Sequence, residues 1–349
     1  MGPVVFVLGS SAGGVGRHVA ELCARLRADG TDVRVAAPAQ TLRRFAFGVP
    51  ATAVEIGPSI DPARDLRAAR ALRRAVAAVP GALVHAHGVR AGFVATLAVP
   101  RRTPLVVTLH NAVLGRGPRA GLGLAVLGVV CRRADVVLGV SGDLVALAHR
   151  LGAGVADRAL VPAPPLPPGD AARGRAVLGT GPVALAVARL APQKDLGTLL
   201  EAAGRSGVRV AVAGDGPLLD DLAARVRAED LPVELLGRRE DVADLLAAAD
   251  VAVSTSVWEG QPVFVQEALR AGVPLVATDA GGTREVTGDA ALLVPVGDAG
   301  AVAQALARLA GDATERAVRS ERARQRAAQL PTGDDAAEQV RRVHAAARG

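Results

Sequence analysis

The chain has 349 residues, half of them apolar, and a formal net charge of +7. Because it is longer than the roughly 250 to 300 residues at which a single hydrophobic core stops growing, we expect two domains. No apolar run reaches the 18 residues of a membrane span, and no basic segment precedes the first apolar stretch. We therefore expect a cytoplasmic protein without a signal peptide.

Short apolar segments alternate with helical patterns along the whole chain. Their continuous Val, Leu and Ala composition is typical of parallel strands that are covered by helices on both faces. The expected strands are 4–8, 33–37, 83–85, 105–109 and 136–140 in the first half, and 183–187, 208–213, 233–236, 251–255 and 275–278 in the second. This alternation predicts an α/β protein with two doubly wound, Rossmann-like parallel sheets.

A proline-rich segment separates the two sets of strands. Residues 161–169 read Val-Pro-Ala-Pro-Pro-Leu-Pro-Pro-Gly, a composition that favours an extended linker over a helix or a sheet strand. We therefore place an N-terminal domain at residues 1–165 and a C-terminal domain at 166–330, facing each other across a cleft. Residues 331–349 are predicted to form a final helix.

The charge is unevenly divided between the two halves. Residues 1–168 carry 20 arginines and 9 acids, a net charge of +11, whereas the remainder has a net charge of −4. The basic half is expected to face something anionic, such as lipid head groups, a phosphate-bearing acceptor or an acidic polysaccharide. Nucleic acid is disfavoured because the chain has no aromatic stacking platform.

Two basic stretches in the first half raise the possibility of peripheral contact with an anionic membrane. The helix predicted at 65–79 carries Arg67, Arg70 and Arg74 on one face, and Arg116 and Arg119 precede the apolar run 122–130. Ordinary amphipathic or buried helices of an arginine-rich protein are the alternative.

A glycine-rich loop follows the first expected strand. Gly13-Gly14-Val15-Gly16 opens a helix, and the missing β-carbons would let a ligand approach the backbone closely, although a purely structural turn is the alternative. A nicotinamide-binding fingerprint is disfavoured, because its third glycine is replaced by Val19. The second strand also ends in Ala36-Ala37-Pro38, with no acid to hold a ribose hydroxyl.

Three histidines stand at the ends of expected strands. Ligands of parallel sheets bind beyond the carboxyl ends of the strands, which favours a binding role over a structural one for His110. Of His85 and His87, only His87 is placed to reach such a ligand. The two form a poor metal site because no third ligand accompanies them. We assign no role to His149 or His344, which fall in helical patterns.

Glu259 and Glu267 bracket the segment Glu-Gly-Gln-Pro-Val-Phe-Val-Gln-Glu. Pro262 is suited to a first helical position, so a helix is predicted to start there, with free N–H groups near Val263 that attract phosphate. An ionised carboxylate accepts two hydroxyl protons, so a diphosphate with a hydroxylated ring on each side would fit this segment. The alternative is a loop acid and a helix-face acid on the surface.

The spacing of the two glutamates resembles the E-x7-E signature of the retaining family-4 glycosyltransferases, which have the two-domain GT-B fold. The resemblance covers most of the chain, because further segments match the family in order and spacing. They are residues 13–18, 108–111, 140–141, 188–195, 213–217, 236–237, 258–267 and 281–285. The chain departs from the family at Val161–Pro164, where an Asn-Gly turn is usual, and this departure bears on the acceptor side.

The resemblance implies roles for these segments. Arg189 and Lys194, expected at the start of a helix, would neutralise the donor diphosphate and stabilise the charge of the leaving group; two solvated surface charges are the alternative. His110 would bind a donor-sugar hydroxyl, and the final helix would pack on the N-terminal domain. The implied catalytic residues are His110, Glu259, Arg189 and Lys194, the donor-binding residues are Gly14, Gly16, Arg238, Gln261, Pro262, Val263, Glu267, Gly282 and Thr283, and the acceptor-side residues are His18 and His87.

The expected activity is the transfer of a sugar, with retention of configuration, from a nucleoside diphosphate sugar to a hydroxyl acceptor that is anionic or lipid-linked. No Asp-x-Asp motif occurs in the chain, so we expect neither a metal ion nor a cofactor. Two alternatives stay open: a sugar-nucleotide epimerase of the same architecture, and a nucleotide-sugar-binding module without turnover.

Overall fold

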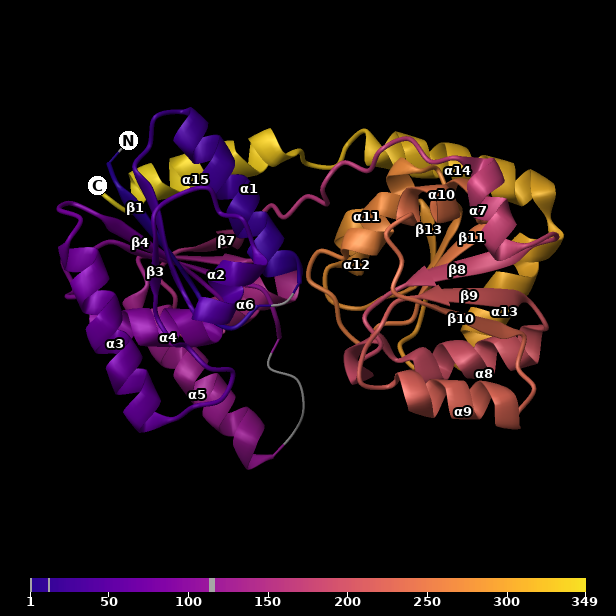
Figure 1. Ribbon diagram of the computed structural model, residues 1–349, viewed down its shortest axis with the longest axis horizontal. Coiled ribbons are helices and arrows are strands. Elements are labelled where there is room, and N and C mark those ends of the chain that lie inside the picture. Colours follow the sequence, from indigo (N-terminus) through magenta and orange to yellow (C-terminus); the bar gives the residue numbers. More distant parts are fainter. Residues whose placement is uncertain (1, 12, 113–116) are drawn as a thin grey trace. The chain divides into compact units, whose positions relative to one another are not determined.

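The computed structural model describes residues 2–11, 13–112 and 117–349, and the chain forms two compact units (Figure 1). Unit 1 is Met1–Pro162 together with Pro331–Gly349, and unit 2 is Ala163–Leu330. The proline-rich segment between them has neither helix nor strand from residue 159 to 170. Arg116 lies outside the described residues.

Unit 1 is built on a parallel sheet of seven strands in the order β3-β2-β1-β4-β5-β6-β7. The strands are β1 (Val4–Leu8), β2 (Val33–Ala37), β3 (Ala51–Ala53), β4 (Leu83–His87), β5 (Leu105–Leu109), β6 (Val136–Gly139) and β7 (Ala156–Arg158). The helices are α1 (Gly14–Ala28), α2 (Ala39–Arg44), α3 (Pro62–Ala77), α4 (Val89–Ala98), α5 (Pro118–Arg133), α6 (Gly142–Arg150) and α15 (Gly333–Ala346).

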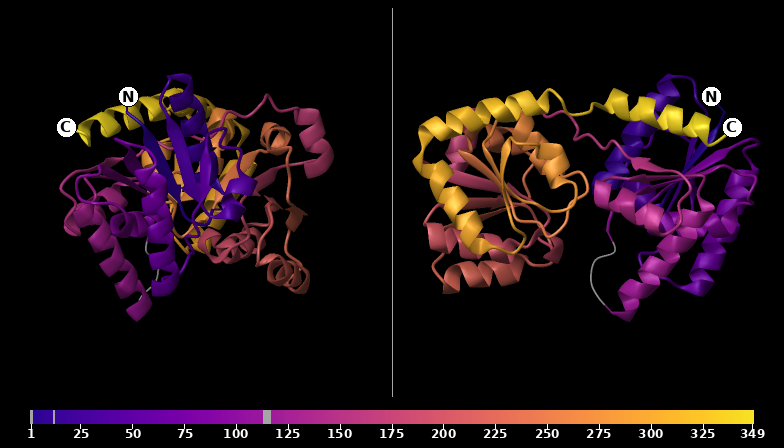
Figure 2. Two further views of the ribbon diagram at one scale, coloured as in Figure 1. Left: turned by 60° about the vertical axis from the view of Figure 1, so that its left-hand side comes forward. Right: turned by 180° about the vertical axis from the view of Figure 1, so that it is seen from behind.

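Helices cover both faces of this sheet, with α3, α4 and α5 side by side on one face and α1 and α15 on the other (Figures 1 and 2). The C-terminal helix α15 starts with a capping box formed by Thr332 and Asp335, which satisfies otherwise unbonded N–H groups. The Gln339 amide accepts a hydrogen bond from the Leu160 N–H at 2.8 Å and donates to the Arg158 carbonyl at 2.6 Å. These bonds join α15 to unit 1.

Unit 2 is built on a parallel sheet of six strands in the order β10-β9-β8-β11-β12-β13. The strands are β8 (Val183–Val187), β9 (Arg209–Ala213), β10 (Val233–Gly237), β11 (Val251–Ser254), β12 (Leu275–Thr278) and β13 (Ala291–Val294). The helices are α7 (Ala171–Leu178), the 3₁₀ turn η1 (Pro192–Lys194), α8 (Leu196–Ser206), α9 (Leu219–Ala228), α10 (Val242–Ala248), α11 (Val263–Arg270), α12 (Thr283–Thr287), α13 (Ala299–Gly311) and α14 (Ala313–Ala327).

The strands of unit 2 separate two hydrophobic cores. Successive side chains of a strand point to opposite faces, and in β9 Val210 and Val212 pack with α8, α9 and α13, whereas Ala211 and Ala213 pack with α7, α10 and α11. All four are buried, as expected for a parallel sheet covered on both faces. The strand pattern read from the sequence therefore reflects burial on both sides.

The doubly wound α/β fold expected from the sequence is confirmed. The strands shared by prediction and structure agree within two residues at each end, whereas β3, β7 and β13 were not predicted. All three residues of β3 are exposed at the sheet edge, so no apolar run marks it. The helix expected to start at Pro262 begins one residue later, with Pro262 as the extended residue before it. Among the described residues, no helix has the length and apolar character that crossing a bilayer requires.

Candidate active site

In unit 2, the order of the strands reverses between β8 and β11, which are neighbours in the sheet. At such a reversal the loops after the two strands diverge to opposite faces and leave a binding position at the carboxyl edge. The loop after β8 carries Arg189 and Lys194, and the loop after β11 carries Glu259. Three predicted catalytic residues therefore come from the two loops at this reversal.

Lys194 and Glu259 form an ion pair between Nζ and Oε1. The Ser256 hydroxyl donates a hydrogen bond to the same carboxylate oxygen at 2.6 Å. The side chains of Lys194 and Glu259 are 26% and 12% exposed, so the pair is largely shielded from water and still reachable from one side. The sequence predicted both residues for the site, but it did not predict their direct contact.

The backbone beside Lys194 is held in an uncommon conformation. Lys194 ends η1 rather than starting a helix as expected, and Asp195 follows with φ 44°, in the left-handed region that non-glycine residues rarely adopt. The Thr255 hydroxyl lies 3.0 Å from the Lys194 carbonyl and 3.1 Å from the Asp195 carbonyl, and donates to them. The Thr198 hydroxyl donates to the Asp195 carboxylate at 2.7 Å. These contacts stabilise the turn that carries Lys194.

The loop after β12 supports the backbone of Glu259. The Gly282 N–H donates to the Glu259 carbonyl at 2.8 Å. Gly281 has φ 56°, and a β-carbon there would lie 2.1 Å from the Glu259 carbonyl oxygen and 2.8 Å from Trp258 Nε1. Gly281 is thus the residue that must be glycine, which sequence reasoning missed.

Gly282 and Thr283, predicted to bind the donor, both form hydrogen bonds within the protein. The Gly282 N–H is already bonded to Glu259, and the Thr283 hydroxyl, which is buried, donates to the Ala280 carbonyl at 2.8 Å. These hydrogen bonds shape the loop, and the donor-binding roles of both residues stay predictions.

Arg189 is exposed, and its side chain has no partner among the described residues. Its loop is supported from β9, because the Leu190 N–H donates to the Asp215 carbonyl at 2.9 Å. A β-carbon on Gly214, which has φ 154°, would lie 1.8 Å from the Ala188 carbonyl oxygen. The glycines of the 213–217 motif therefore let two loops pack together under Arg189.

Helix α11 presents free backbone donors four residues after Glu259. Within the described residues, the N–H groups of Val263, Phe264 and Val265 have no acceptor, and the first turn contains no acid. An anion is favoured at such a helix end. Glu267 and Gln261 are partly exposed in and beside this helix.

Arg238, predicted to lie near the nucleotide base, has a side chain that is 72% exposed and is 3.9 Å from Glu240. Neither contact nor burial marks it as a binding residue, so its role stays a prediction.

Unit 1 contains a row of buried histidines at and below the carboxyl edge of its sheet. His87 and His110, from the ends of β4 and β5, are joined by a hydrogen bond of 3.0 Å between Nδ1 and Nε2. The ring centroid of His18, on α1, lies 6.0 Å from that of each. These are the three histidines that the sequence predicted for the site, and the structure brings them together.

The row continues into the body of unit 1 through two further histidines. His85 stacks on His87 with ring centroids 4.4 Å apart, and its Nδ1 lies 2.9 Å from Nε2 of His344 on α15. Its Nε2 lies 2.8 Å from the Thr108 hydroxyl. The sequence assigned no role to His344, because nothing in the helical pattern of α15 indicates which strand residue it will meet.

Burial sets the protonation of this row. It lowers the pKa of His18 to about 4 and the pKa values of His110 and His344 to about 3. The pKa values of His85 and His87 lie well below the usual value, first because of burial and then because of neighbouring histidines. The five imidazoles are therefore neutral at pH 7, and His110 can donate or accept a hydrogen bond without carrying charge.

The glycine-rich loop of unit 1 divides into an open and a packed part. Gly14 has no atom within 4 Å of the place where a β-carbon would stand, whereas a β-carbon on Gly16 would lie 2.3 Å from the Phe45 ring. Gly16 is buried, so its lack of a side chain is explained by packing. The donor-binding roles of Gly14 and Gly16 both stay predictions.

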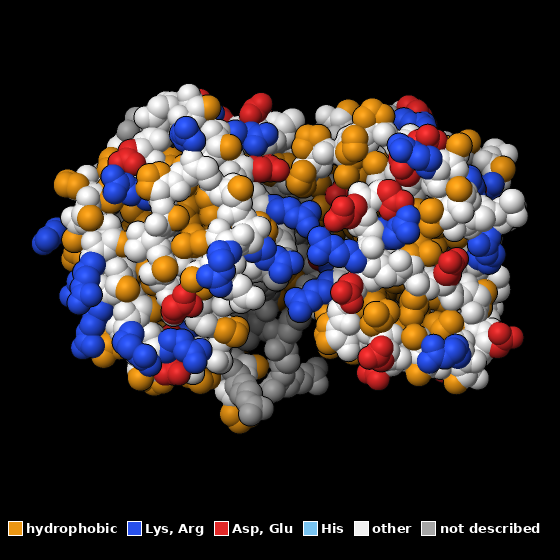
Figure 3. Space-filling view, viewed as in Figure 1, with side chains coloured by type: hydrophobic (Ala, Val, Ile, Leu, Met, Phe, Trp, Pro, Cys, Tyr) orange, Lys and Arg blue, Asp and Glu red, His pale blue; other side chains and the backbone are white. Residues whose placement is uncertain are grey.

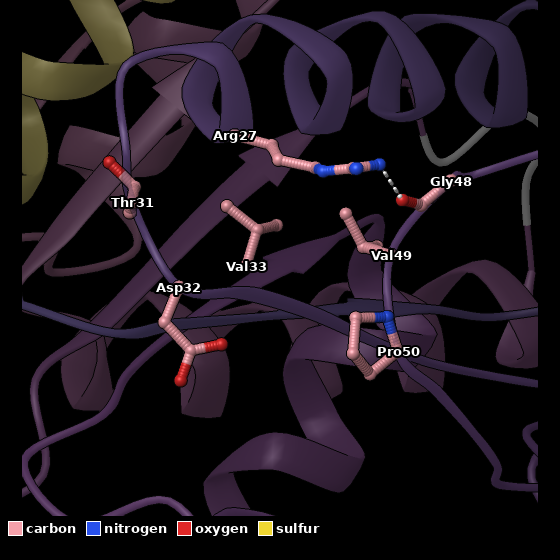
Figure 4. Close-up of a pocket in the computed structure, with 7 residues that line it drawn as sticks. All are labelled: Arg27, Thr31, Asp32, Val33, Gly48, Val49 and Pro50. Atoms are coloured by element: carbon pink, nitrogen blue, oxygen red, sulfur yellow. Dashed lines mark hydrogen bonds between the residues drawn. The ribbon is translucent and has the colours of Figure 1, made fainter.

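A cavity of about 570 Å³ lies away from these residues (Figure 4). Its lining includes Val33, the first residue of β2, and Arg27, whose Nη1 donates to the Gly48 carbonyl at 2.7 Å. It is at the amino end of β2, whereas ligands of parallel sheets bind beyond the carboxyl ends. Its place at the amino end of the sheet therefore separates this cavity from the candidate site.

Two family models match the chain and together cover most of it. The model described as a glycosyl transferase 4-like domain matches residues 13–164, and the model described as glycosyl transferases group 1 matches residues 181–312. The chain belongs to the family-4 glycosyltransferases.

Relatives of this glycosyltransferase include a GDP-mannose-dependent alpha-mannosyltransferase of Mycobacterium tuberculosis, 36% identical over 124 residues, and N-acetyl-alpha-D-glucosaminyl L-malate synthase of Bacillus anthracis, 34% identical over 122 residues. Each match covers 34% of this chain, and they cover 31% and 32% of the two relatives. The matched region thus spans about a third of each relative's own length.

Solved structures identify the fold of this glycosyltransferase. HepE of Anabaena in complex with UDP superimposes with a TM-score of 0.83 at 22% identity, over 98% of this chain and 99% of that one. WaaG, a glycosyltransferase involved in lipopolysaccharide biosynthesis, superimposes with a TM-score of 0.74 at 16% identity, over 96% and 99%. The glycosyltransferase has the two-domain GT-B fold.

Proposed function

We propose that this glycosyltransferase transfers a sugar, with retention of configuration, from a nucleoside diphosphate sugar to a hydroxyl acceptor. The observation that carries the proposal is the ion pair of Lys194 and Glu259 at the strand reversal of unit 2. Lys194 lies in the loop after β8. Glu259 and the free N–H groups at the start of α11 lie in and directly after the loop that follows β11. This set matches a diphosphate attached to a hydroxylated sugar.

In the proposed reaction, the bond between the anomeric carbon and the diphosphate oxygen breaks, and the acceptor oxygen bonds to that carbon on the same face. The acceptor proton passes to a phosphate oxygen of the leaving diphosphate. Lys194, Arg189 and the N-terminus of α11 would stabilise the charge that develops on that diphosphate. Glu259 would hold a hydroxyl group of the sugar.

The proposed reaction uses no metal ion, because protein cations and backbone donors take over the neutralisation of the diphosphate. Within the described residues there is no group of three or more His, Cys, Asp or Glu side chains arranged to hold a metal. The epimerase and the silent binding module are not favoured, since the relatives are named as transferases or synthases of sugar-containing products.

A panel of nucleoside diphosphates tests the donor class. With UDP, GDP and ADP each in large excess, we expect one of them to raise the melting temperature of the protein by several degrees, since a ligand at 100 times its Kd stabilises the folded state by about 2.7 kcal/mol. EDTA should leave the shift unchanged if no metal is needed. The absence of a shift with all three nucleotides would contradict the proposed donor, and a shift abolished by EDTA would contradict metal independence.

We further propose that the acceptor is anionic or lipid-linked and that unit 1 contacts an anionic membrane through α3, α4 and α5. The surface of α3 is strongly basic (Figure 3), because its only acid, Asp65, is buried against Arg90. Its exposed arginines are Arg64, Arg67, Arg70, Arg73 and Arg74. Exposed apolar side chains on the three helices are Leu66, Leu97, Leu122, Leu124 and Val129. Basic and apolar groups on one layer suit the interface of an anionic bilayer.

Vesicle co-sedimentation tests the membrane contact. The protein should sediment with vesicles of phosphatidylcholine and phosphatidylglycerol and remain in the supernatant with phosphatidylcholine alone. A variant with Arg67→Glu, Arg70→Glu and Arg74→Glu should lose binding, because each basic residue near the surface contributes about 1 kcal/mol. The charge-matched control carries Arg227→Glu, Arg322→Glu and Arg324→Glu, three exposed positions of unit 2. Equal binding to both kinds of vesicle, or equal loss in both variants, would contradict the proposal.

A further inference from the structure

Ser256 is a buried residue between β11 and Glu259, and the proposed reaction gives it no task so far. Its relative exposure is 1%, and its hydroxyl donates to Oε1 of Glu259 at 2.6 Å. Its own carbonyl accepts a hydrogen bond from the Thr278 hydroxyl at 2.6 Å. Ser256 is therefore fixed by β12 on one side and fixes Glu259 on the other.

The two partners of the Glu259 carboxylate use the same oxygen. Lys194 and Ser256 both bind Oε1, and within the described residues Oε2 has no partner. Oε2 is not among the buried polar atoms that lack a hydrogen bond, so it is open to solvent or a ligand. A carboxylate held by one oxygen presents the other in a defined direction.

A flexible cation does not fix the direction in which a carboxylate points. The Lys194 ammonium group ends a flexible four-carbon chain and can pair with either oxygen, whereas the Ser256 hydroxyl sits on a short side chain whose backbone is bonded to Thr278. When a diphosphate attracts Lys194, the Ser256 hydrogen bond is the remaining contact to the carboxylate. Ser256 thus keeps the orientation of Glu259 independent of the ion pair.

We propose that Ser256 is a positioning residue that aims Oε2 of Glu259 at a hydroxyl group of the donor sugar. This inference rests on the proposed function, because it assumes that Glu259 faces the sugar rather than the nucleotide. Thr255, its neighbour, acts on the other half of the pair through the backbone of Lys194. The two consecutive hydroxyl residues after β11 therefore hold both members of the pair.

Removing the hydroxyl should weaken the interaction with the sugar and leave the interaction with the diphosphate unchanged. The measured quantity is the ratio of two dissociation constants by calorimetry, that of UDP-glucose to UDP or that of GDP-mannose to GDP, whichever base binds. In Ser256→Ala we expect this ratio to rise about tenfold, the size of one lost hydrogen bond to a charged group, with the Kd of the nucleoside diphosphate unchanged. Turnover should fall by a similar factor.

Two further variants separate positioning from packing. Ser256→Thr keeps the hydroxyl and should keep the ratio near that of the unmodified protein. Ser206→Ala removes a hydroxyl that donates to the Ala203 carbonyl at the end of α8, and it should change neither constant. A general loss of structure in Ser256→Ala would instead raise both dissociation constants and lower the melting temperature.

The result that overturns the inference is an unchanged ratio in Ser256→Ala, or an equal rise of both constants. Glu259→Gln distinguishes this failure from a failure of the proposed function. If Glu259→Gln raises the ratio and Ser256→Ala does not, Glu259 faces the sugar without the help of Ser256. If Glu259→Gln also leaves the ratio and turnover unchanged, the proposed role of Glu259 is wrong.

Discussion

Replacing Lys194 with alanine is expected to lower turnover about a hundredfold or more, because it removes a cation that would stabilise the departing diphosphate. The same change should lower the melting temperature of unit 2. It leaves the Glu259 carboxylate, which is 12% exposed, with Ser256 as its remaining partner. The measurements are steady-state kinetics and thermal unfolding of the same preparations.

Three companion variants separate the two effects. Arg189→Ala should lose turnover and nucleotide affinity without loss of stability, since the exposed side chain has no partner within the described residues. The double variant Lys194→Ala/Glu259→Gln should regain stability and remain inactive, because no unpaired charge is left. Arg205→Ala breaks an exposed ion pair with Glu201 and serves as the control, with an effect below about 1 kcal/mol. Near-normal turnover in Lys194→Ala would contradict the assignment.

Unit 1 is expected to lose stability steeply as the pH falls below about 6.5, the usual pKa of histidine. Five buried histidines have lowered pKa values in the folded state, with His18 at about 4 and His110 and His344 at about 3. Below pH 6.5 the unfolded chain binds protons at these sites and the folded unit does not, so acid favours unfolding. Each histidine contributes at most about 1.4 kcal/mol per pH unit between its unfolded and folded pKa values.

The distribution of residues lets fluorescence follow unit 2 alone, whereas circular dichroism also includes the helices of unit 1. All six histidines belong to unit 1, and Trp258, the single tryptophan, belongs to unit 2. Urea unfolding between pH 7.5 and 5.5 should therefore show a circular dichroism midpoint that falls with pH, while the fluorescence midpoint changes much less. His149→Ala removes an exposed histidine and should not alter the slope. A circular dichroism midpoint that is constant over this range would refute the prediction.

Much of the fold could be predicted because burial on both sides of a parallel strand leaves a direct signal in composition. β1, β2, β5, β8 and β12 begin and end at the predicted residues. The two edge strands of unit 1, β3 and β7, lack this signal: β7 reads Ala-Asp-Arg and pairs with β6 through the backbone. An apolar pattern thus reveals a strand that is buried in the core, but it does not reveal an exposed edge strand that is held by backbone hydrogen bonds.

The candidate site was predictable in part for the same reason. Strand ends indicate which residues stand at the ligand edge, which singled out His110, whereas the resemblance to the family singled out Lys194 and Glu259. Their contacts were not, because Lys194 and Glu259 are 65 positions apart and meet only through the pairing of β8 with β11. The contribution of Ser256, Thr255 and Gly281 depends on hydrogen bonds and on one positive φ angle.

Unit 1 is assembled from two stretches of chain separated by the whole of unit 2. Since translation proceeds from the N-terminus, residues 331–349 leave the ribosome only after residues 163–330 have been made. Until then, the nascent first stretch lacks the helix that carries His344, and Nδ1 of His85 has no imidazole to bond. The final closure of unit 1 must therefore wait for residues 331–349, which are made after all of unit 2.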